Sequence, residues 1–313
     1  MSAASTDDAA SSVCAVVVTW HPDTAALDVM LRRLLPQVGA LVLVDNASDD
    51  PAVAELCARD PRVAFMPQET NLGLAAALNR GTDWARGHGF RHVLLLDQDS
   101  LPSESMVAEL LRASMELAPQ GRVAAVGPRF RDEHGRHDAP FVRIRFPFNR
   151  KLHCGEDCDG HVRCDFLISS GTLIPLDALD TIGGMDESLF IDNVDMDWCF
   201  RARAEGFALY GVCAARMEHR LGDARRRLPG APRGVIVHAP QRLFFIMRNR
   251  LLLYRRASTP AAWIAQDVPR VLVKLLLFSV LIGPRWRNLR AMLAGLRAGM
   301  RGEARIPENM SLQ

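Results

Sequence analysis

The sequence predicts an α/β fold built on a mostly parallel, doubly wound sheet. Three observations lead to this prediction. Apolar, β-branched runs alternate with segments of helical spacing through the first 128 residues. Several runs are apolar at consecutive positions, as in strands that are covered on both faces. Some end abruptly in polar residues, and parallel sheets gather such ends at one edge, where ligands bind.

In the first half, strands and helices are expected in strict alternation. The expected strands cover residues 13–20, 40–48, 62–68, 91–97 and 123–128. The expected helices between them cover residues 26–37, 51–60, 74–89 and 103–117. Pro51 suits the first turn of its helix, and glycines end the third helix.

The second half departs from this pattern. Charged residues, Gly, His and Phe fill residues 129–164, which predicts a hairpin or mobile insertion. A strand at 165–175, a short helix at 176–184 and a helix led in by Trp198 follow. Another strand is expected to run from Ala208 to near His219. We expect a basic, proline-containing loop next, and then a helical C-terminal region.

Composition narrows the class of protein. The 313 residues carry a net charge of only +2, too little to indicate nucleic-acid binding. Seven scattered cysteines favour a reduced, cytoplasmic protein over a disulfide framework. The first twelve residues lack an apolar signal-peptide core and are expected to form a disordered leader. No window has the length of uncharged apolar residues that a membrane span requires.

The expected strand at 91–97 ends in paired acids, Asp97 and Asp99, in the stretch LLLDQDS. Asp and Ser favour turns, so the pair has a simple structural explanation. Its position after a buried strand also suits a hard divalent cation whose other ligands are waters and substrate phosphates. Such a cation stabilises a phosphate leaving group.

A second acidic cluster lies near the start of the Trp198 helix. Its members are Asp186, Glu187, Asp192, Asp195 and Asp197. The helix dipole accounts for Asp195 and Asp197 without catalysis. Asp192 follows apolar residues, and a carboxylate in such a setting suits a general base. His219 is a lone histidine, which is commonly structural, although its imidazole can complete a cation site, more naturally for Mn²⁺ than for Mg²⁺.

The order of these segments resembles that of inverting glycosyltransferases of family 2, which have the GT-A fold. The resemblance covers about Val13 to Tyr254, and Asp192–Asn193 departs from it, since many members have two adjacent acids there. The stretches that carry it are VVVTWHP, LVDNASDD, NLGLAAALNRG, LLLDQDS, ISSGTLI, IGGMDESLFIDNVDMDWCFRA, EHRLGD and APQRLFFIMRNR. The last four look most like the rhamnosyltransferase branch, whose donor is dTDP-L-rhamnose.

The resemblance implies a role for each matching residue. Asp45 would bind the pyrimidine base, Asp99 would ligate Mg²⁺ or Mn²⁺ with Asp97 and His219, and Asp192 would be the base, with Asp195 as the alternative. Trp198 would frame the acceptor, and Arg242 or Arg248 would steady the diphosphate. The residues implied for the nucleotide pocket are Thr19, Trp20, Asp45, Asn46, Asn71, Gly73, Asn79 and Asp97.

The same resemblance divides the chain into parts. Residues 13–233 would form the catalytic domain, behind a leader at 1–12 and before a helical region at 234–313. Within it we expect a nucleotide-binding half, an insertion and an acceptor half, at 13–128, 129–164 and 165–233. The insertion clusters Cys and His residues, which can bind zinc, but their spacing fits no common zinc finger.

The C-terminal region is apolar and then basic. Residues 271–283 are apolar apart from Lys274, and the arginines that follow alternate with Leu and Met behind Trp286. This pattern is typical of a helix lying on an anionic membrane surface, here the inner face of the plasma membrane. It equally fits a helix pair that packs on the catalytic domain or across a homodimer. Both interpretations stay open at this point.

The expected activity is sugar transfer to a hydroxyl of a saccharide or lipid-linked acceptor in bacterial cell-surface polysaccharide synthesis, such as that of O-antigen. A family member using a UDP-hexose is the main alternative. A haloacid dehalogenase-like phosphatase also has D-x-D after a strand, but normally on its first strand. A non-catalytic sugar-nucleotide-binding protein would not need Asp97, Asp99 and Asp192.

Overall fold

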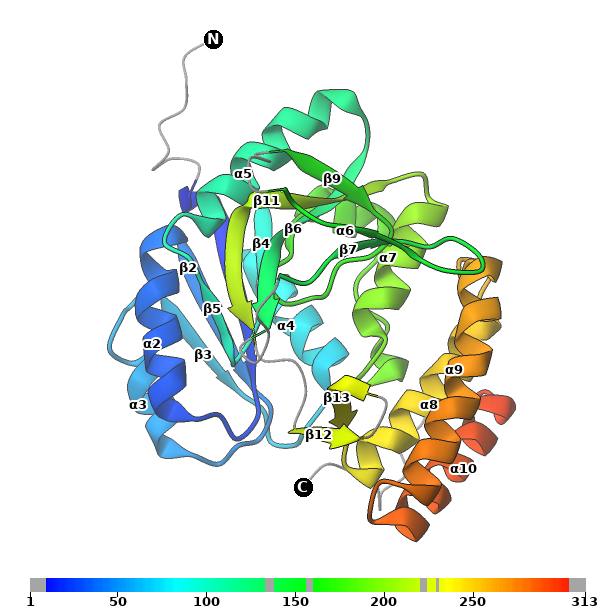
Figure 1. The fold of residues 1–313 in the computed structure, drawn as a ribbon. Coiled ribbons are helices and arrows are strands. Elements are labelled where there is room, and N and C mark those ends of the chain that lie inside the picture. Colours follow the sequence, from blue (N-terminus) through cyan, green and yellow to red (C-terminus); the bar gives the residue numbers. More distant parts are fainter. Residues whose placement is uncertain (1–9, 133–137, 156–159, 220–223, 229–230, 304–313) are drawn as a thin grey trace.

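The computed structural model describes residues 10–132, 138–155, 160–219, 224–228 and 231–303. Nine strands form the central sheet, in the order β3-β2-β1-β4-β10-β6-β11-β5, with β9 paired to β11 (Figure 1). The first four, β1 to β4, are parallel to one another. Their bounds are Val13–Thr19, Ala40–Asp45, Val63–Pro67 and His92–Asp97.

The other half of the sheet is mixed, so the expectation of a mostly parallel sheet is wrong there. β10 runs antiparallel to β4 and β6, and β11 is parallel to β6 but antiparallel to β5 and β9. The chain enters β10 beside the carboxyl end of β4, where Gly171 N–H donates to the Leu95 carbonyl at 2.7 Å. Because β10 starts at that end, it runs antiparallel to β4. The bounds are Ser100–Pro102 for β5, Val123–Asp132 for β6, His161–Cys164 for β9, Leu173–Pro175 for β10 and Ala208–His219 for β11.

Helices cover both faces of the sheet, as predicted. Alternate residues of β1 point to opposite faces, with Val16 and Val17 in different core clusters. One face packs against α2, α3 and α5, which span Thr24–Leu34, Pro51–Cys57 and Met106–Leu117. The other face packs against α4, α6 and α7, which span Leu74–Gly87, Leu176–Ile182 and Val194–Ala204. Short 3₁₀ turns lie at Leu35–Gln37, Ala118–Gln120 and Glu187–Leu189.

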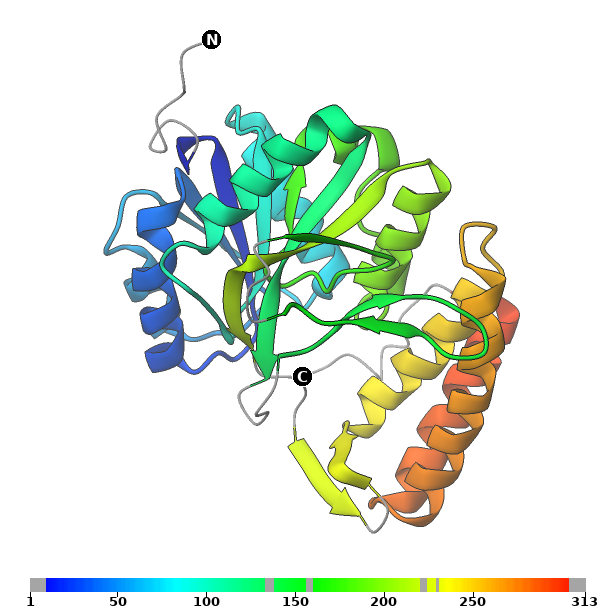
Figure 2. The ribbon, with the colours of Figure 1, turned by 45° about the horizontal axis from the view of Figure 1, so that its top comes forward.

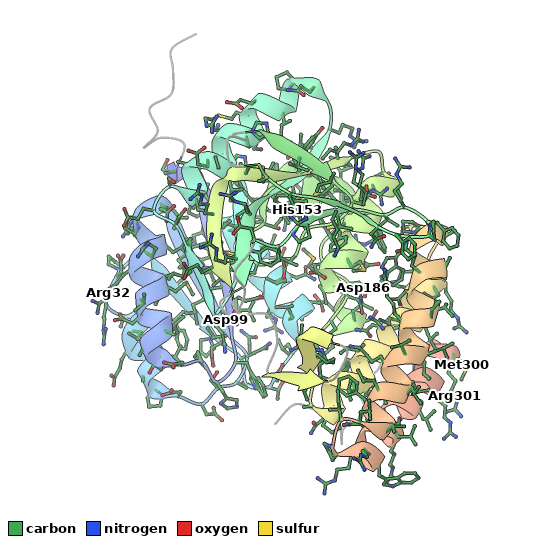
Figure 3. All side chains as sticks on the ribbon, viewed as in Figure 1. Arg32, Asp99, His153, Asp186, Met300 and Arg301 are labelled. Atoms are coloured by element: carbon green, nitrogen blue, oxygen red, sulfur yellow. A yellow bond between two sulfur atoms is a disulfide. The ribbon has the colours of Figure 1, made fainter. Side chains whose placement is uncertain are left out.

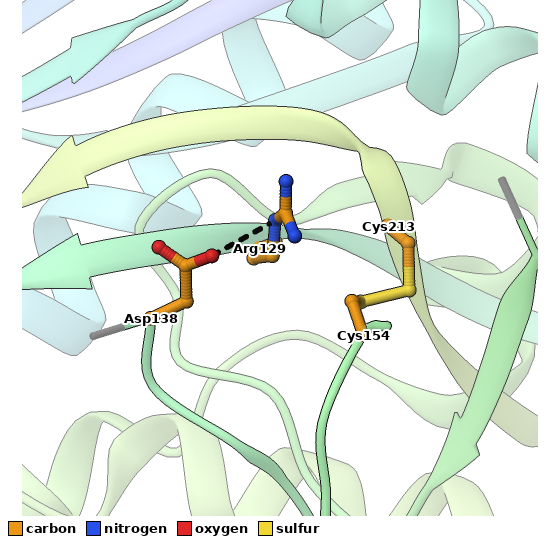
Figure 4. The surroundings of a disulfide bond; sticks show 4 residues. All are labelled: Arg129, Asp138, Cys154 and Cys213. Atoms are coloured by element: carbon orange, nitrogen blue, oxygen red, sulfur yellow. Dashed lines mark ion pairs between the residues drawn. A yellow bond between two sulfur atoms is a disulfide. The ribbon is translucent and has the colours of Figure 1, made fainter. Parts of the chain in front are cut away.

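The insertion contains a small antiparallel hairpin of β7 and β8, at Phe141–Arg143 and Arg150–Leu152. A disulfide between Cys154 and Cys213 ties the segment after β8 to β11, close to the Arg129–Asp138 ion pair (Figure 4). The expectation that the cysteines are all reduced is wrong for this pair. Because the two cysteines are 59 positions apart, no local pattern in the sequence indicates that they pair.

The insertion's zinc site does not assemble among the described residues. Cys154 is used in the disulfide. Cys164 is buried, donates to the Leu209 carbonyl, and has its thiol pKa raised by burial to about 12. Cys158 lies outside the described residues. Within the described ranges, no three His, Cys, Asp or Glu side chains gather around a candidate metal position.

The C-terminal region is a three-helix unit beside the sheet (Figures 1 and 2). Its helices α8, α9 and α10 span Pro240–Tyr254, Ala261–Val280 and Arg285–Arg301, and share an apolar cluster. The expected loop at 224–233 is instead part of a two-stranded hairpin, β12 at Ala224–Leu228 and β13 at Ala231–Val237. None of the helices in the described ranges combines the length and apolar character of a membrane span.

Small residues allow α10 to lie directly on α8. A Cβ atom added at Gly295 would stand 2.3 Å from the Phe244 carbonyl oxygen, and one at Gly299 would stand 2.7 Å from the Arg248 carbonyl oxygen. Both contacts are with backbone, which a rotamer change cannot move away. This face of α10 therefore packs on α8 within the C-terminal helical region.

We expect Gly295→Ala to lower the free energy of unfolding by about 1–3 kcal/mol, because α10 must shift away from α8. The matched control is Gly87→Ala in α4, where an added Cβ meets nothing within 4 Å. That change should stabilise the chain by up to about 1 kcal/mol through helix propensity. Urea unfolding curves of the two variants make the comparison. Equal stability of Gly295→Ala and the unsubstituted chain would contradict the close packing.

Candidate active site

The carboxyl ends of β1, β2 and β4 meet at one edge of the sheet, as predicted. Thr19 and Asp45 are register partners, and the Thr19 hydroxyl donates to Asp45 Oδ1 at 2.7 Å. Ser48 donates to the same carboxylate from both its hydroxyl and its backbone N–H, at 2.6 and 2.9 Å. Asp45 is only 4% exposed. Its side chain is thus fixed in one orientation, as recognition of a flat base requires.

Gln98, the central residue of the D-x-D stretch, joins two strand ends. Its side-chain oxygen accepts from the Trp20 backbone N–H at 2.7 Å, and its amide nitrogen Nε2 donates to the Trp20 carbonyl at 3.2 Å. This amide therefore fixes the spacing of β1 and β4 beyond their last pairs. Sequence reasoning missed the role, because nothing in LLLDQDS distinguishes Gln98 from an ordinary turn residue.

The loop before α4 is built by two asparagines that were implied for the nucleotide pocket. Asn46 Oδ1 accepts from Leu72 N–H at 3.0 Å, and Asn71 Oδ1 accepts from Gly73 N–H at 2.9 Å. Gly73 has φ +84°, and an added Cβ would stand 2.3 Å from the Phe190 ring. Only glycine suits this position, which brings the loop against the segment leading to Asp192.

Asp97 and Asp99 lie at the end of β4, and Asp99 faces outward (Figure 3). The Asp97 backbone N–H donates to the Ser170 hydroxyl at 3.2 Å. The next strand, β5, pairs with β11, so that Ser100 is opposite His219 in the backbone register. The structure thus brings the strand carrying His219 next to the D-x-D stretch, as the sequence predicts.

Asp195, in the first turn of α7, joins this edge from the other half of the sheet. Burial, together with the carboxylates of Asp97 and Asp192, raises the pKa of its carboxyl from its ordinary value to about 6. Backbone N–H groups of Met196 and Ser169 act in the opposite direction. Asp195 is therefore within electrostatic range of its neighbour Asp192 and of Asp97 from a distant stretch, and its raised pKa suits a proton acceptor near neutral pH.

Asp192 is held differently, in an ion pair with Arg242 of α8. Arg242 Nε lies 3.1 and 3.3 Å from the two carboxylate oxygens of Asp192, and its Nη2 lies 3.2 Å from Oδ1. A guanidinium bound to both oxygens orients the carboxylate. This geometry favours Asp195 over Asp192 as the base, which reverses the preference drawn from the sequence.

The loop from Phe190 to Asn193 has an unusual backbone. Phe190, Asp192 and Asn193 have φ values of 62°, 65° and 64°, which L-residues rarely adopt. Asn249 of α8 holds the loop, since its side-chain Nδ2 donates to the carbonyls of Leu189, Ile191 and Asp192 at 2.8, 2.7 and 2.9 Å. The polar pair Arg248 and Asn249, within the otherwise largely apolar run FFIMRNRLLLY, is the signal that could have indicated this role.

Arg248, the other member of that pair, was implied for the diphosphate, and the structure gives it another role. It is fully buried, and its Nη2 donates to the carbonyls of Ser188 and Leu189 at 2.7 and 3.2 Å. Its Nε donates to Asn249 Oδ1 at 3.0 Å, and burial lowers the pKa of its guanidinium to about 10. Arg248 therefore supports the strained loop.

Two further residues implied for ligand sites are structural instead. Trp198 is 2% exposed and donates through Nε1 to the Gly183 carbonyl at 2.9 Å, so it belongs to the core and not to an acceptor surface. Asn79 uses both ends of its amide on Met185, donating to the carbonyl at 2.9 Å and accepting from the N–H at 2.8 Å. It anchors the 184–187 loop to α4.

Asp197 is explained by an ion-pair network that the sequence did not indicate. The residue is fully buried, with Arg201 Nε 2.9 Å from its Oδ2. Arg256, just after α8, contacts both Asp197 and Asp186. The network fixes α7, and with it Asp195, against the end of α8. Because Arg256 is 59 residues from Asp197, the pairing appears only in the folded chain.

The donor set at this edge fits a hard divalent cation. Asp97 and Asp99 supply carboxylate oxygens, which Mg²⁺ and Mn²⁺ prefer. Negative charge accumulates here, as the pKa of Asp195 indicates. The structure does not describe the side chain of His219. Among the side chains that it does describe, no third metal ligand joins Asp97 and Asp99. Oxygens of a bound ligand and water would therefore complete the coordination shell.

Comparison with known proteins agrees with this geometry. The family model described as "Glycosyl transferase family 2" matches residues 16–169. The chain is 29% identical over 251 residues to "dTDP-rhamnosyl transferase RfbF" of Shigella flexneri, covering 80% of this chain and 82% of that protein. It is also 29% identical over 206 residues to the uncharacterized protein Rv1525 of Mycobacterium tuberculosis, covering 64% of this chain and 69% of that one.

Two solved structures share the fold. A structure of GalNAc-T7 with UDP, GalNAc and Mn²⁺ superposes with a TM-score of 0.59 at 14% identity, covering 93% of this chain. The chain spans only 56% of the length of that structure. A structure of residues 1–349 of S. aureus TarS superposes with a TM-score of 0.54 at 13% identity, covering 93% of this chain and 92% of that one.

These similarities confirm the fold and the enzyme class predicted from the sequence, and they set aside the phosphatase and the non-catalytic binding protein. The first half of the site, up to Ser169, lies inside the matched segment. Asp192 and Asp195 lie beyond it, in the part covered by the comparison of whole chains. The chain is therefore a glycosyltransferase that carries a family 2 domain at residues 16–169 and resembles the rhamnosyltransferase branch.

Proposed function

We propose that this chain transfers L-rhamnose from dTDP-L-rhamnose to a hydroxyl of a saccharide or lipid-linked acceptor, with inversion at the anomeric carbon. The observation that supports the reaction type most strongly is the meeting of Asp97, Asp192 and Asp195 beside the fixed carboxylate of Asp45. The donor rests on the relative named a dTDP-rhamnosyl transferase, which covers most of both chains. Bacterial cell-surface polysaccharide synthesis is the setting that this donor suits.

In the proposed reaction, Asp195 accepts the proton of the acceptor hydroxyl. The acceptor oxygen forms a bond to the anomeric carbon while the bond from that carbon to the diphosphate oxygen breaks on the opposite face. The nucleoside diphosphate leaves with the electron pair. Attack opposite the leaving group inverts the configuration. A raised pKa near the working pH makes Asp195 an effective acceptor for this proton.

The remaining residues position the two substrates. Asp45, held by Thr19 and Ser48, would accept a hydrogen bond from the pyrimidine base. Asp97 and Asp99 would hold Mg²⁺ or Mn²⁺, which supplies positive charge to the leaving diphosphate. Arg242 lies beside Asp192 and would bring a second positive charge to the same edge.

A donor panel tests this proposal. The chain is incubated with dTDP-L-rhamnose or UDP-hexoses, with and without Mg²⁺ or Mn²⁺, and release of the nucleoside diphosphate is followed. We expect dTDP-L-rhamnose to give the fastest release, and removal of the cation with EDTA to abolish it. Faster release from a UDP-hexose would contradict the donor while leaving the family unchanged. Full activity in EDTA would contradict the cation.

A further inference from the structure

The outer face of α9 is an apolar stripe exposed to solvent. The stripe repeats every three or four residues, so one side of the helix carries it along its full length. We define it as Ala265, Val268, Pro269, Leu272, Val273, Leu276 and Val280. Leu272, Val273 and Leu276 of the stripe are 61%, 64% and 67% exposed. Because the opposite side of α9 packs in the three-helix core, this helix is apolar on both sides.

The stripe continues into the turn between α9 and α10. Leu281 is 52% exposed, and Trp286 at the start of α10 is 73% exposed. Across the described residues, thirteen large apolar side chains are exposed, and nine of them belong to the segment from Val268 to Met300. The exposed apolar surface is therefore concentrated on α9 and α10 and is not scattered over the molecule, which marks an interaction surface.

The exposed charged residues within α9 and α10 are of one sign, and Glu303, just after α10, pairs with Arg301 at 3.4 Å. On α9 and α10 every fully exposed charged side chain is an arginine, at positions 270, 285, 287, 290, 297 and 301. Arg301 and Met300 lie at the outer side of the helical unit in Figure 3. The acid of α9, Asp267, is 2% exposed and is used by Tyr254 and Arg250, so it does not neutralise these arginines.

We propose that the α9–α10 surface lies on an anionic lipid bilayer, with the α9 stripe and Trp286 inserted at the headgroup boundary. Arginines beside an apolar stripe match lipid phosphates above acyl chains, and tryptophan favours that boundary. A second copy of the chain would instead bring arginines against arginines, at a cost in like-charge repulsion. Charge thus selects the lipid surface over a homodimer.

The surface is independent of the transferase site. The buried face of α8 directs Asn249 and Arg248 toward the strained loop, whereas the α9 stripe is exposed to solvent. The β12–β13 hairpin lies beside the α9–α10 turn in both views, with Val235 and Val237 packed on the same helices (Figures 1 and 2). Attachment there would hold the enzyme at the place where a lipid-linked acceptor is found.

Vesicle sedimentation tests the proposal. The full chain is mixed with vesicles of phosphatidylcholine alone or with about one third phosphatidylglycerol, and the bound fraction is measured. We expect binding to the anionic vesicles that weakens as salt shortens the Debye length from about 10 Å at 0.1 M to about 3 Å at 1 M. Leu272→Gln with Leu276→Gln should lower the partition coefficient by about tenfold or more. Replacing Arg285, Arg287 and Arg290 by Gln should lower it by about fivefold for each arginine.

The matched control is Met115→Ser, which removes an apolar side chain that is 59% exposed but lies on α5. It should bind vesicles like the unsubstituted chain, and all variants should keep their melting temperature because the changed side chains are exposed. Absence of binding to either vesicle, or unchanged binding of the double leucine variant, would overturn the proposal. The proposal would also be overturned if light scattering showed a dimer that dissociates when Leu272 and Leu276 are replaced. Release of nucleotide with a water-soluble acceptor should be unchanged in every variant, so this test can fail without affecting the proposed function.

Discussion

Asp195→Asn is expected to lower kcat for sugar transfer by about 10²–10⁴-fold, because it removes the proposed proton acceptor and keeps the shape of the side chain. The carboxyl meets the requirements of a base in position and in pKa, since it lies with Asp97 and Asp192 at the carboxyl edge and its pKa is raised to about 6. The measurement is steady-state transfer at saturating donor and acceptor. Normal affinity for the nucleoside diphosphate would show that the site itself is intact.

Asp192→Asn is the matched control, since it makes the same change on a neighbouring acid. Asp192 is bound by Arg242 through both oxygens, so its loss should disturb the position of that arginine and raise KM more than it lowers kcat. If Asp192→Asn abolished turnover while Asp195→Asn kept it near normal, the assignment of the base to Asp195 would be wrong.

The raised pKa also predicts how activity and stability depend on pH. Transfer needs the deprotonated base, so the rate should rise with pH through about 6 and lose this dependence in Asp195→Asn. In the unfolded chain the carboxyl titrates near its ordinary value, so the folded state binds the proton more tightly. The charged Asp195 carboxylate therefore destabilises the folded chain, an effect that is absent below about pH 4 and complete above about pH 6 to 7. Asp195→Asn should raise the free energy of unfolding by about 2 kcal/mol at pH 8 and leave it nearly unchanged at pH 4.

Asn249→Leu is expected to lower the free energy of unfolding by about 3 kcal/mol or more and to reduce kcat strongly in the molecules that remain folded. One amide nitrogen serves three carbonyls of a loop whose residues hold positive φ angles. Leucine has a similar size but donates no hydrogen bond, so the buried carbonyls lose their partner. The loop is then free to relax, and Asp192 and Asp195 leave their positions. Urea unfolding and kcat measured well below the melting temperature report the two effects.

Asn288→Leu separates a change in the site from a loss of stability. Asn288 is 1% exposed and donates to the Ile282 and Phe278 carbonyls at 2.9 and 3.3 Å, at the α9–α10 turn. Its replacement removes the same kind of buried amide far from the strained loop. We expect a comparable loss of stability with kcat preserved. Equal loss of kcat in both variants would contradict a specific role for Asn249 in the site.

The sequence was most informative where a local pattern determines the structure. The consecutive apolar residues of β1, β2 and β4, and their polar ends at Thr19, Asp45 and Asp97, predicted the nucleotide edge because parallel strands must bring such ends together. The acidic stretch before α7 predicted the second half of the site for a similar reason, since it precedes a helix that packs on the same sheet.

The sequence was least informative where a partner distant in the chain decides the outcome. The direction of β10 depends on where the loop at Ser170 enters the sheet, which no local pattern shows. Arg248 was implied for the diphosphate but is buried against carbonyls from another segment, and Trp198 was implied for the acceptor side but fills the core. The order of Asp192 and Asp195 as candidates changed for the same reason, because Arg242 pairs with one of them only in the folded chain.

The anomeric configuration of the transferred sugar tests the proposed reaction most directly. The product made from dTDP-L-rhamnose is isolated, and the one-bond coupling between C1 and H1 of the new linkage is measured by NMR. A base at Asp195 that directs the acceptor oxygen opposite the diphosphate predicts a configuration at C1 opposite to that of the donor, formed by the unsubstituted chain and not by Asp195→Asn. Retention of the donor's configuration, or an inverted product formed equally fast by Asp195→Asn, would contradict it.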